Sequence, residues 1–273
     1  MKIIILPNLQ KEHAQSAAEE AAVILRENGA DVEIDRDFEA VREKAMPDAD
    51  ILIAVGGDGT ILKTAVKAAS LGIPLLGINT GRLGFMASAE RDELRLLPRL
   101  VAGDYSVDRR IMIEAVLLRG GNIVWRTDAL NEVLAARAYS KITDFEVTTG
   151  GTVVTRVRAD GIMIATPTGS TAYALACGGP IAEPSADILQ MTPVCPHSLF
   201  ARTMIFKGSR ILRITHSAES ESAVFISADG KGNVPFEKGD ILKVQKSDKY
   251  LKLIDIKGGA FFSAVNGKLM AAI

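Results

Sequence analysis

The residues best suited to chemistry form one glycine-rich stretch, Gly56-Gly57-Asp58-Gly59-Thr60. It follows an apolar run at 51–55, which is typical of a parallel strand buried on both faces. Glycine lets backbone N–H groups approach an anion closely, so the three glycines suit a phosphate cradle. We expect Thr60 to cap the following helix, whose N-terminus also favours phosphate.

Asp58 is unusual in such a cradle, because a carboxylate repels phosphates unless it has a task there. It could accept a proton from an attacking hydroxyl or hold Mg²⁺, and phosphoryl transfer commonly needs both. A tight turn with Asp as its cap is the alternative, since Gly and Asp are common turn residues. The stretch alone leaves both interpretations open.

Three other clusters bear on this choice. The stretch NTGRLGF at 79–85 follows the next apolar strand and is either a second wall of the same crevice or another glycine-rich loop. The pair Asn131-Glu132, taken alone, indicates only exposed polar residues. An apolar strand at 162–165 leads into TPTGST at 166–171, where hydroxyls and glycine suit a polar ligand and Tyr173 is available to stack or hydrogen-bond.

Length and composition set the frame. The chain has 273 residues, 24% charged and 48% hydrophobic, with a net charge of −1. These values predict one large or two modest soluble domains, with no nucleic-acid or membrane partner. Cys177 and Cys195 are expected to be reduced thiols in the cytoplasm. The three histidines are scattered, so no metal-ligand spacing is present.

The elements that must position these residues change in character along the chain. Strands at 1–6, 31–35, 51–55 and 73–78 alternate with helices at 10–28, 61–70 and 90–101, as in an open α/β sheet. From about residue 107, strand-like stretches are separated by glycine-rich turns, which indicates an all-β second domain. We predict an N-terminal domain at 1–106 plus 252–273 and a β-rich domain at 107–251.

The chain resembles the NAD kinase family. The resemblance rests on GGDGT, the Asn131-Glu132 pair and ADGIMIATPTGSTAYALACGGPI at 159–181, and it extends through GINTGRLGF and TPVCPHSLFAR. It implies a Rossmann-like α/β domain, a β-sandwich-like C-terminal domain and a ligand site in the crevice between them. The implied reaction moves the γ-phosphoryl of ATP, or of polyphosphate, to the 2′-hydroxyl of the adenosine ribose of NAD, which gives NADP.

The resemblance also implies roles for individual residues. Asp58 is the expected base, with Gly59 beside it at the NAD site, and the GGDGT backbone would hold donor phosphates with Mg²⁺. Shared sites in the family imply a homodimer or homotetramer. The positions implied for NAD binding are Asn131, Glu132, Lys141, Arg158, Asp160, Thr171, Ala172, Tyr173 and Lys231. Ala176 and Cys177 replace the Ser and Ala usual in the family, so a hydroxyl is lost at 176.

Several other functions compete with this one. In lipid kinases GGDGT is commonly followed at once by Asn-Glu, whereas here Ile61-Leu62-Lys63 follows. A phosphofructokinase would share the phosphate loop without TPTGSTAY. A non-catalytic dinucleotide sensor would keep the fold, although the retained Asp58 argues against it. A Rossmann dehydrogenase is disfavoured because no Gly-x-Gly-x-x-Gly follows the first strand.

Overall fold

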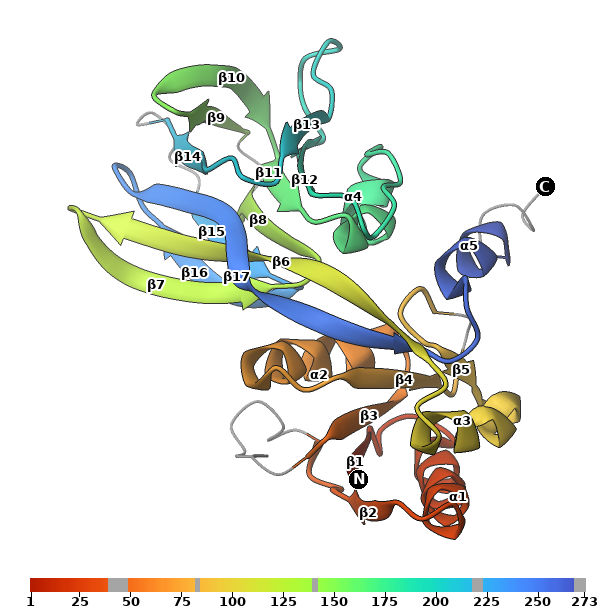
Figure 1. The fold of residues 1–273 in the computed structure, drawn as a ribbon. Coiled ribbons are helices and arrows are strands. Elements are labelled where there is room, and N and C mark those ends of the chain that lie inside the picture. Colours follow the sequence, from red (N-terminus) through yellow and green to blue (C-terminus); the bar gives the residue numbers. More distant parts are fainter. Residues whose placement is uncertain (39–48, 82–83, 139–141, 218–222, 268–273) are drawn as a thin grey trace. The chain divides into compact units, whose positions relative to one another are not determined.

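The computed structural model describes residues 1–38, 49–81, 84–138, 142–217 and 223–267 (Figure 1). The chain divides into two compact units, Met1–Arg110 with Lys249–Ile273, and Ile111–Asp248. Two strands cross the division, β6 (Ser106–Arg119) and β17 (Ile241–Asp255). The domain boundaries predicted at 106/107 and 251/252 fall within these two strands.

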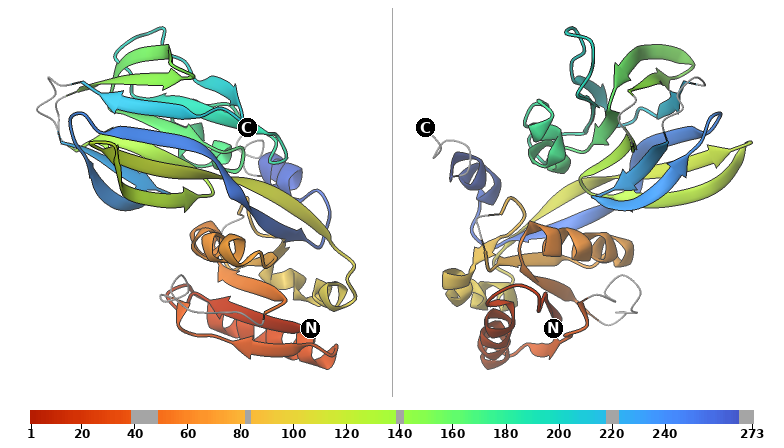
Figure 2. Two further views of the ribbon diagram at one scale, coloured as in Figure 1. Left: turned by 60° about the vertical axis from the view of Figure 1, so that its left-hand side comes forward. Right: turned by 180° about the vertical axis from the view of Figure 1, so that it is seen from behind.

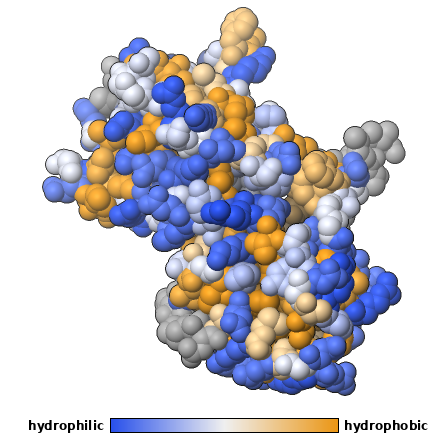
Figure 3. Space-filling view, viewed as in Figure 1, coloured by the Kyte–Doolittle hydropathy of each residue, from blue (hydrophilic) through white to orange (hydrophobic). Residues whose placement is uncertain are grey.

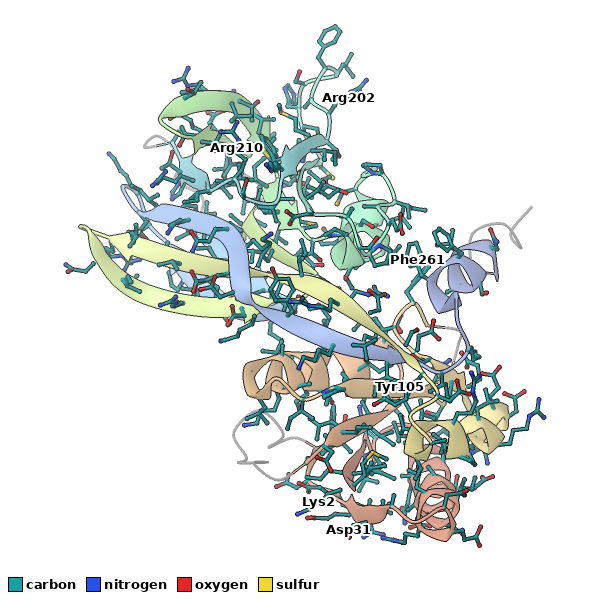
Figure 4. The ribbon with its side chains drawn as sticks, viewed as in Figure 1. Lys2, Asp31, Tyr105, Arg202, Arg210 and Phe261 are labelled. Carbon is teal, nitrogen blue, oxygen red and sulfur yellow. The ribbon has the colours of Figure 1, made fainter. Side chains whose placement is uncertain are left out.

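The first unit contains a parallel sheet in the order β4-β3-β1-β2. Its strands are β1 (Lys2–Pro7), β2 (Asp31–Ile34), β3 (Ile51–Gly56) and β4 (Leu75–Asn79). Figure 4 shows Lys2 and Asp31 on β1 and β2, where they occupy paired positions of the register. The chain runs from β1 to β2 on one side and then to β3 on the other, so β1 and β3 flank a topological switch point.

Helices cover both faces of this sheet. α1 (Ala14–Glu27) packs its buried alanines against Ile3, Ile53 and Ile78, and the turned views of Figure 2 show it along β1 and β2. Because neighbouring strand residues point to opposite faces, Gly77 faces away from Ile78. An added Cβ at Gly77 would meet the Ile61 side chain of α2 (Asp58–Leu71), which therefore covers the other face.

The prediction of a single helix at 90–101 is wrong. The structure has β5 (Ala89–Glu90), the 3₁₀ helix η2 (Arg91–Leu96) and α3 (Pro98–Val101) instead. Glu90 is extended and forms a capping box with Glu93, so η2 begins after it. Pro98 has no N–H to continue that helix, and it starts α3 as the first residue of a new one.

The second unit is built from two antiparallel sheets around one core. One follows the order β10-β9-β14-β17, with β6 pairing β17 and β7, and the other follows β13-β12-β11-β8-β15-β16. Phe145, Ile164 and Ile226 from the two sheets share this core. The remaining elements of the chain are β7 (Asn122–Ala129), β8 (Glu132–Arg137), β9 (Thr143–Thr149), β10 (Thr152–Ala159), β11 (Gly161–Ala165), η3 (Thr168–Thr171), α4 (Tyr173–Ala176), β12 (Ile188–Val194), β13 (Met204–Lys207), β14 (Leu212–His216), β15 (Val224–Ala228), β16 (Lys231–Phe236) and α5 (Ala260–Val265).

The predicted fold class, an α/β unit followed by a β-sandwich-like unit, is confirmed. Within the part of the chain that the structure describes, no helix has the length and apolar character needed to cross a membrane. Cys177 and Cys195 are free thiols, as expected.

Candidate functional site

The GGDGT stretch lies at the switch point of the parallel sheet. β3 ends at Gly56 and α2 begins at Asp58, so Gly57 is the N-cap of α2 and the prediction that Thr60 caps this helix is wrong. Thr60 is buried in the first turn, where its Oγ1 accepts a hydrogen bond of 3.1 Å from the Asn8 side chain. Asn8 follows β1 and also donates its backbone N–H to Val55. It thus joins the two strand ends, a role that sequence reasoning missed.

Asp58 is held by the loop that follows β4. Its Oδ2 accepts the backbone N–H of Phe85 at 2.9 Å, and its Oδ1 accepts that of Met86 at 3.3 Å. Gly84 makes this approach possible, because an added Cβ there would lie 2.2 Å from Asp58 Oδ1. The half-buried carboxylate is therefore fixed at the N-terminus of α2, the end of a helix that attracts phosphate.

Asn79 connects the end of β4 to the segment beyond it. Its amide nitrogen donates to Glu90 at 2.6 Å, and its Oδ1 accepts the N–H of Gly81 at 3.1 Å. Burial raises the pKa of Glu90, while the hydrogen bond from Asn79 opposes that rise. A hollow of about 520 Å³ borders Asn79, Thr80 and Glu90. The NTGRLGF loop is thus tied to Asp58 at Phe85 and braced at Asn79; its residues 82 and 83 lie outside the described residues.

In the second unit, Glu132 is the first residue of β8 and Asn131 immediately precedes it. The side chain of Asp229, in the turn between β15 and β16, binds the backbone of both residues. Its Oδ1 accepts the N–H of Asn131 at 2.8 Å and that of Glu132 at 3.3 Å. Sequence reasoning missed Asp229. Its only signal was the Asp-Gly dipeptide between two strand-like stretches, which predicts a hairpin turn and not a distant contact.

Glu132 is buried, with 8% of its surface exposed, contrary to the exposed pair indicated by the sequence alone. Burial, and secondarily the charge of Asp229, raises the pKa of Glu132 to about 7. Among the described residues, its Oε2 has no hydrogen-bond partner. A buried carboxyl oxygen without a partner is costly for the fold, and this is characteristic of a group reserved for a ligand.

The TPTGST loop lies directly against Asn131. Thr166 accepts the N–H of Gly169 at 3.1 Å, and its own N–H donates to Asn131 O at 2.9 Å. An added Cβ at Gly169 would lie 2.1 Å from Asn131 O. The loop and the Asn131-Glu132 pair therefore form one structural piece.

The hydroxyl groups of this loop differ from expectation. Their density predicts ligand binding, but Ser170 accepts the N–H of Ala182 at 2.9 Å and donates to Pro167 O at 2.6 Å. The Thr171 hydroxyl donates to Thr168 O at 3.2 Å. These hydroxyls stabilise the loop itself. Tyr173 and Ala176, by contrast, are exposed on α4.

The remaining predicted residues are distributed as follows. Arg158 binds both carboxylate oxygens of Asp144 on the neighbouring strand, each at 2.8 Å, and these bonds hold the pKa of Asp144 below its usual value. Asp160 accepts from Arg137 at 2.6 Å. Lys231 is exposed at the start of β16, and Lys141 lies outside the described residues.

Tyr173 lies near several of these groups, as the causes of its pKa shift show. Burial raises the pKa of Tyr173, and the nearby thiols and the Asp160 and Glu132 carboxyls add to that rise. Glu132, Asp160 and Tyr173 are therefore close enough to interact electrostatically within the second unit. Thr171 and Ala172 immediately precede Tyr173 and are half-buried.

Comparison with known proteins identifies both units. Residues 2–105 match the ATP-NAD kinase N-terminal domain, and residues 130–256 match the ATP-NAD kinase C-terminal domain. The chain is 39% identical over 235 residues to an NAD kinase of Symbiobacterium thermophilum, covering 85% of this chain and 83% of the relative. It is 32% identical over 279 residues to an NAD kinase of Caldanaerobacter subterraneus, covering 98% of both.

Solved structures agree with this assignment. An NAD kinase from Archaeoglobus fulgidus in complex with ATP matches with a TM-score of 0.76 and 26% identity, over 99% of each chain. A yeast NADH kinase complexed with NADH has the same fold, with a TM-score of 0.84 at 24% identity over 99% of this chain and 87% of that one. The resemblance found in the sequence motifs is confirmed.

Proposed function

This chain belongs to the NAD kinase family, and we propose that Asp58 is the base of its reaction. The enzyme transfers the γ-phosphoryl group of ATP to the 2′-hydroxyl of the adenosine ribose of NAD, which gives NADP. The observation that supports Asp58 is its position: its carboxylate is fixed at the start of α2 by the N–H groups of Phe85 and Met86. Positioning supplies most of the rate in phosphoryl transfer.

In this proposal Asp58 accepts the proton of the 2′-hydroxyl as the ribose oxygen bonds to the γ-phosphorus. The bond from that phosphorus to the bridging oxygen breaks, and ADP leaves with the bonding electron pair. The N-terminus of α2 and the glycines of GGDGT hold the donor phosphates, because backbone N–H groups and the helix dipole favour anions there. Neither Gly57 nor Gly59 would meet a protein atom within 4 Å through an added Cβ, so this surface is open to a phosphate.

Mg²⁺ is proposed as the cofactor that accompanies ATP and neutralises charge on its phosphates. No group of three or more His, Cys, Asp or Glu side chains that could hold a metal occurs among the described residues. Mg²⁺ commonly binds through one or two carboxylates together with substrate phosphates and water, so the single carboxylate of Asp58 beside bound ATP would suffice to hold it. Asp58 lies within the GGDGT stretch itself, so it is the carboxylate that would stand beside the donor phosphates.

The adenosine part of NAD is assigned to the second unit. Asn131 and Glu132 would bind it, since Glu132 presents a buried oxygen without a partner among the described residues. Tyr173, with 46% of its surface exposed, is available to stack on a ring. Thr171, Ala172 and Ala176 would line the same pocket, and Arg158, Asp160, Lys231 and Lys141 are proposed as further contacts of the dinucleotide.

We also propose that the enzyme is a cytoplasmic homodimer or homotetramer. Leu199 and Phe200, on the loop between β12 and β13, are 85% and 90% exposed. Figure 3 shows a hydrophobic knob at this loop, and Figure 4 labels Arg202 beside it, where the guanidinium braces the loop by donating to Leu199 O at 2.6 Å. Apolar side chains on a braced loop are typical of an interface. Light scattering of the wild type and Phe200→Ser tests this, and a monomeric wild type would refute it.

The direct test of the proposed chemistry is NADP formation from NAD with ATP, followed by an enzyme-coupled assay. Polyphosphate in place of ATP and EDTA in place of Mg²⁺ are the two comparison arms. We expect NADP with ATP and loss of NADP with EDTA. NAD binding without NADP formation from either donor would instead identify a dinucleotide sensor.

A further inference from the structure

We propose that Asp229 is a positioning residue for NAD: its carboxylate fixes the backbone of Asn131 and Glu132, and its charge beside the Glu132 carboxyl makes NAD binding release a proton. The inference rests on the proposed role of Glu132 in binding the adenosine part of NAD, and it assigns the contact to the ribose hydroxyls. Asp229 is not part of the motifs that carry the family resemblance. It acts through Asn131 and Glu132 and does not itself contact NAD.

The geometry is that of a buried anion site filled by a side chain. Asp229 has 7% of its surface exposed, and its carboxylate accepts three successive backbone N–H groups. Leu130 donates to Oδ2 at 3.0 Å, while Asn131 and Glu132 donate to Oδ1 at 2.8 and 3.3 Å. The Asp229 N–H donates back to Glu132 O at 3.0 Å. These four bonds determine where β8 begins and therefore where the Glu132 side chain starts.

The backbone of Asp229 is itself unusual. Its φ is 50°, in the left-handed region that residues other than glycine seldom adopt. Such a conformation is strained unless local hydrogen bonds compensate, and Asn and Asp tolerate it best. A turn between β15 and β16 needs no buried carboxylate, so the four bonds to 130–132 are the compensation. Asp229→Asn would keep this backbone preference while removing the charge.

The negative charge of Asp229 acts on the Glu132 carboxyl. Its pKa is raised to about 7, first by burial and then by Asp229. The other titratable groups that face it are Tyr173 and Cys177, both from the α4 segment, whose own pKa values are raised in part by Glu132. No basic side chain among the described residues pairs with Glu132. The carboxyl is thus largely protonated at slightly acidic pH before NAD arrives.

Ribose hydroxyl groups are donors, and an ionised carboxylate accepts from them more strongly than a neutral carboxyl does. NAD binding therefore favours the ionised form of Glu132 and expels its proton. With a pKa of about 7 in the free enzyme, roughly three-quarters of a proton leaves per NAD at pH 6.5. The backbone N–H groups of 130–132, which donate to the Asp229 carboxylate, keep the Glu132 carboxylate in place beside the ribose as this happens.

The experiment is isothermal titration of NAD into the wild type at pH 6.5, in buffers of different ionisation enthalpy, which gives the number of protons released. The same titration uses Asp229→Asn, Glu132→Gln and Asp240→Asn. Asp240 is a matched control: it is also buried, 2% exposed, and accepts the N–H of Glu237 at 2.8 Å and the guanidinium of Arg119 at 2.9 Å. KM for NAD, kcat and thermal stability are measured for each variant.

We expect Glu132→Gln to abolish the proton release that the wild type and Asp240→Asn show. Asp229→Asn should reduce it, because the pKa of Glu132 falls without the neighbouring charge, and should raise KM for NAD on the order of tenfold with a smaller change in kcat. A merely structural role for Asp229 would lower thermal stability and leave the proton count unchanged.

The variants distinguish a wrong role for Glu132 from a wrong role for Asp229. If Glu132→Gln keeps the wild-type KM and proton release, the proposed role of Glu132 in NAD binding is wrong. If Glu132→Gln loses both while folded Asp229→Asn matches the wild type, only the present inference is overturned. If Asp229→Asn does not fold, Asp229→Glu replaces it, since this variant keeps the charge but moves the carboxylate relative to the N–H groups of 130–132. A raised KM for NAD with proton release retained then supports the inference, and a wild-type KM overturns it.

Discussion

Gly84 and Asp58 are in such close approach that a Cβ at residue 84 would lie 2.2 Å from Asp58 Oδ1. Gly84→Ala must therefore displace the carboxylate or the loop that donates to it. We predict a fall in kcat on the order of a hundredfold, because small misplacements of a reacting group have effects of this size. The loss of stability should be about 1–3 kcal/mol, as for an overpacked site. Steady-state kinetics and thermal unfolding measure both.

Gly81→Ala is the control for this substitution. Gly81 belongs to the same loop, but an added Cβ there meets only Asn79 Oδ1, at 4.0 Å. It should keep a near-normal kcat. Equal losses in the two variants would mean that the loop responds to any added side chain, and that the approach of Gly84 to Asp58 is not what matters.

Gly59 offers the opposite situation, a glycine that the protein itself does not require. It lies within α2, and an added Cβ would meet nothing within 4 Å. Gly59→Ala should raise the free energy of unfolding by about 0.5–1 kcal/mol, since Ala is the better helix former. It should also weaken substrate binding, if phosphate or ribose approaches the backbone there. Chemical unfolding and KM values test the pair of effects, and unchanged KM values would remove Gly59 from the site.

Local signals allowed much of this architecture to be predicted. The apolar run at 51–55 and the glycines after it located β3 and the loop that ends it, although α2 begins at Asp58, three residues before the predicted start at 61. The helix predicted at 90–101 failed because Glu90 and Pro98 interrupt it through capping and a missing N–H, which periodicity does not register. Thr60 failed as a cap because α2 begins at Asp58 with Gly57 as its N-cap, and the Thr60 hydroxyl binds Asn8, from a distant segment.

The candidate site was harder to predict wherever a role depends on a partner far along the chain. Asp229 bonds to Glu132 across 97 positions, and nothing in an Asp-Gly turn identifies that contact. The density of hydroxyls at 166–171 predicted ligand binding, but the Ser170 hydroxyl already accepts the N–H of Ala182, which lies in an irregular segment. Composition identifies groups able to make hydrogen bonds, and only the fold decides which of them are already used.

Gly169 supports the NAD half of the site in the way that Gly84 supports Asp58. An added Cβ would lie 2.1 Å from the carbonyl oxygen of Asn131, which is backbone and cannot rotate away. Gly169→Ala should raise KM for NAD more than KM for ATP. Gly208→Ala is the matched control, since its Cβ would lie 2.2 Å from Asp187 Oδ1, on a residue with no assigned role. A rise in KM for NAD that is the same in both variants would refute the specific role of Gly169.

Glu132 also makes stability depend on pH. Its folded pKa of about 7 lies above the ordinary value of 4.5, so the folded state holds this proton more tightly than the unfolded state. The contribution of the Glu132 proton to the free energy of unfolding is fully present below pH 4.5 and is lost as the pH rises through 7. Glu132→Gln should therefore match the wild type near pH 4.5 and exceed it at pH 8 by about 3 kcal/mol at most. Urea unfolding at both pH values checks this, and an equal difference at both would contradict the raised pKa.

Asp58→Asn tests whether Asp58 is the base, because Asn keeps the size of the side chain and one acceptor oxygen for the loop. The measurement is the single-turnover rate of NADP formation with saturating ATP, Mg²⁺ and NAD, together with the dissociation constant of NAD. If Asp58 is the base, the rate falls by at least about a hundredfold while the dissociation constant stays within a few-fold of the wild type. A rate close to that of the wild type would contradict the assignment of Asp58 and require another proton acceptor.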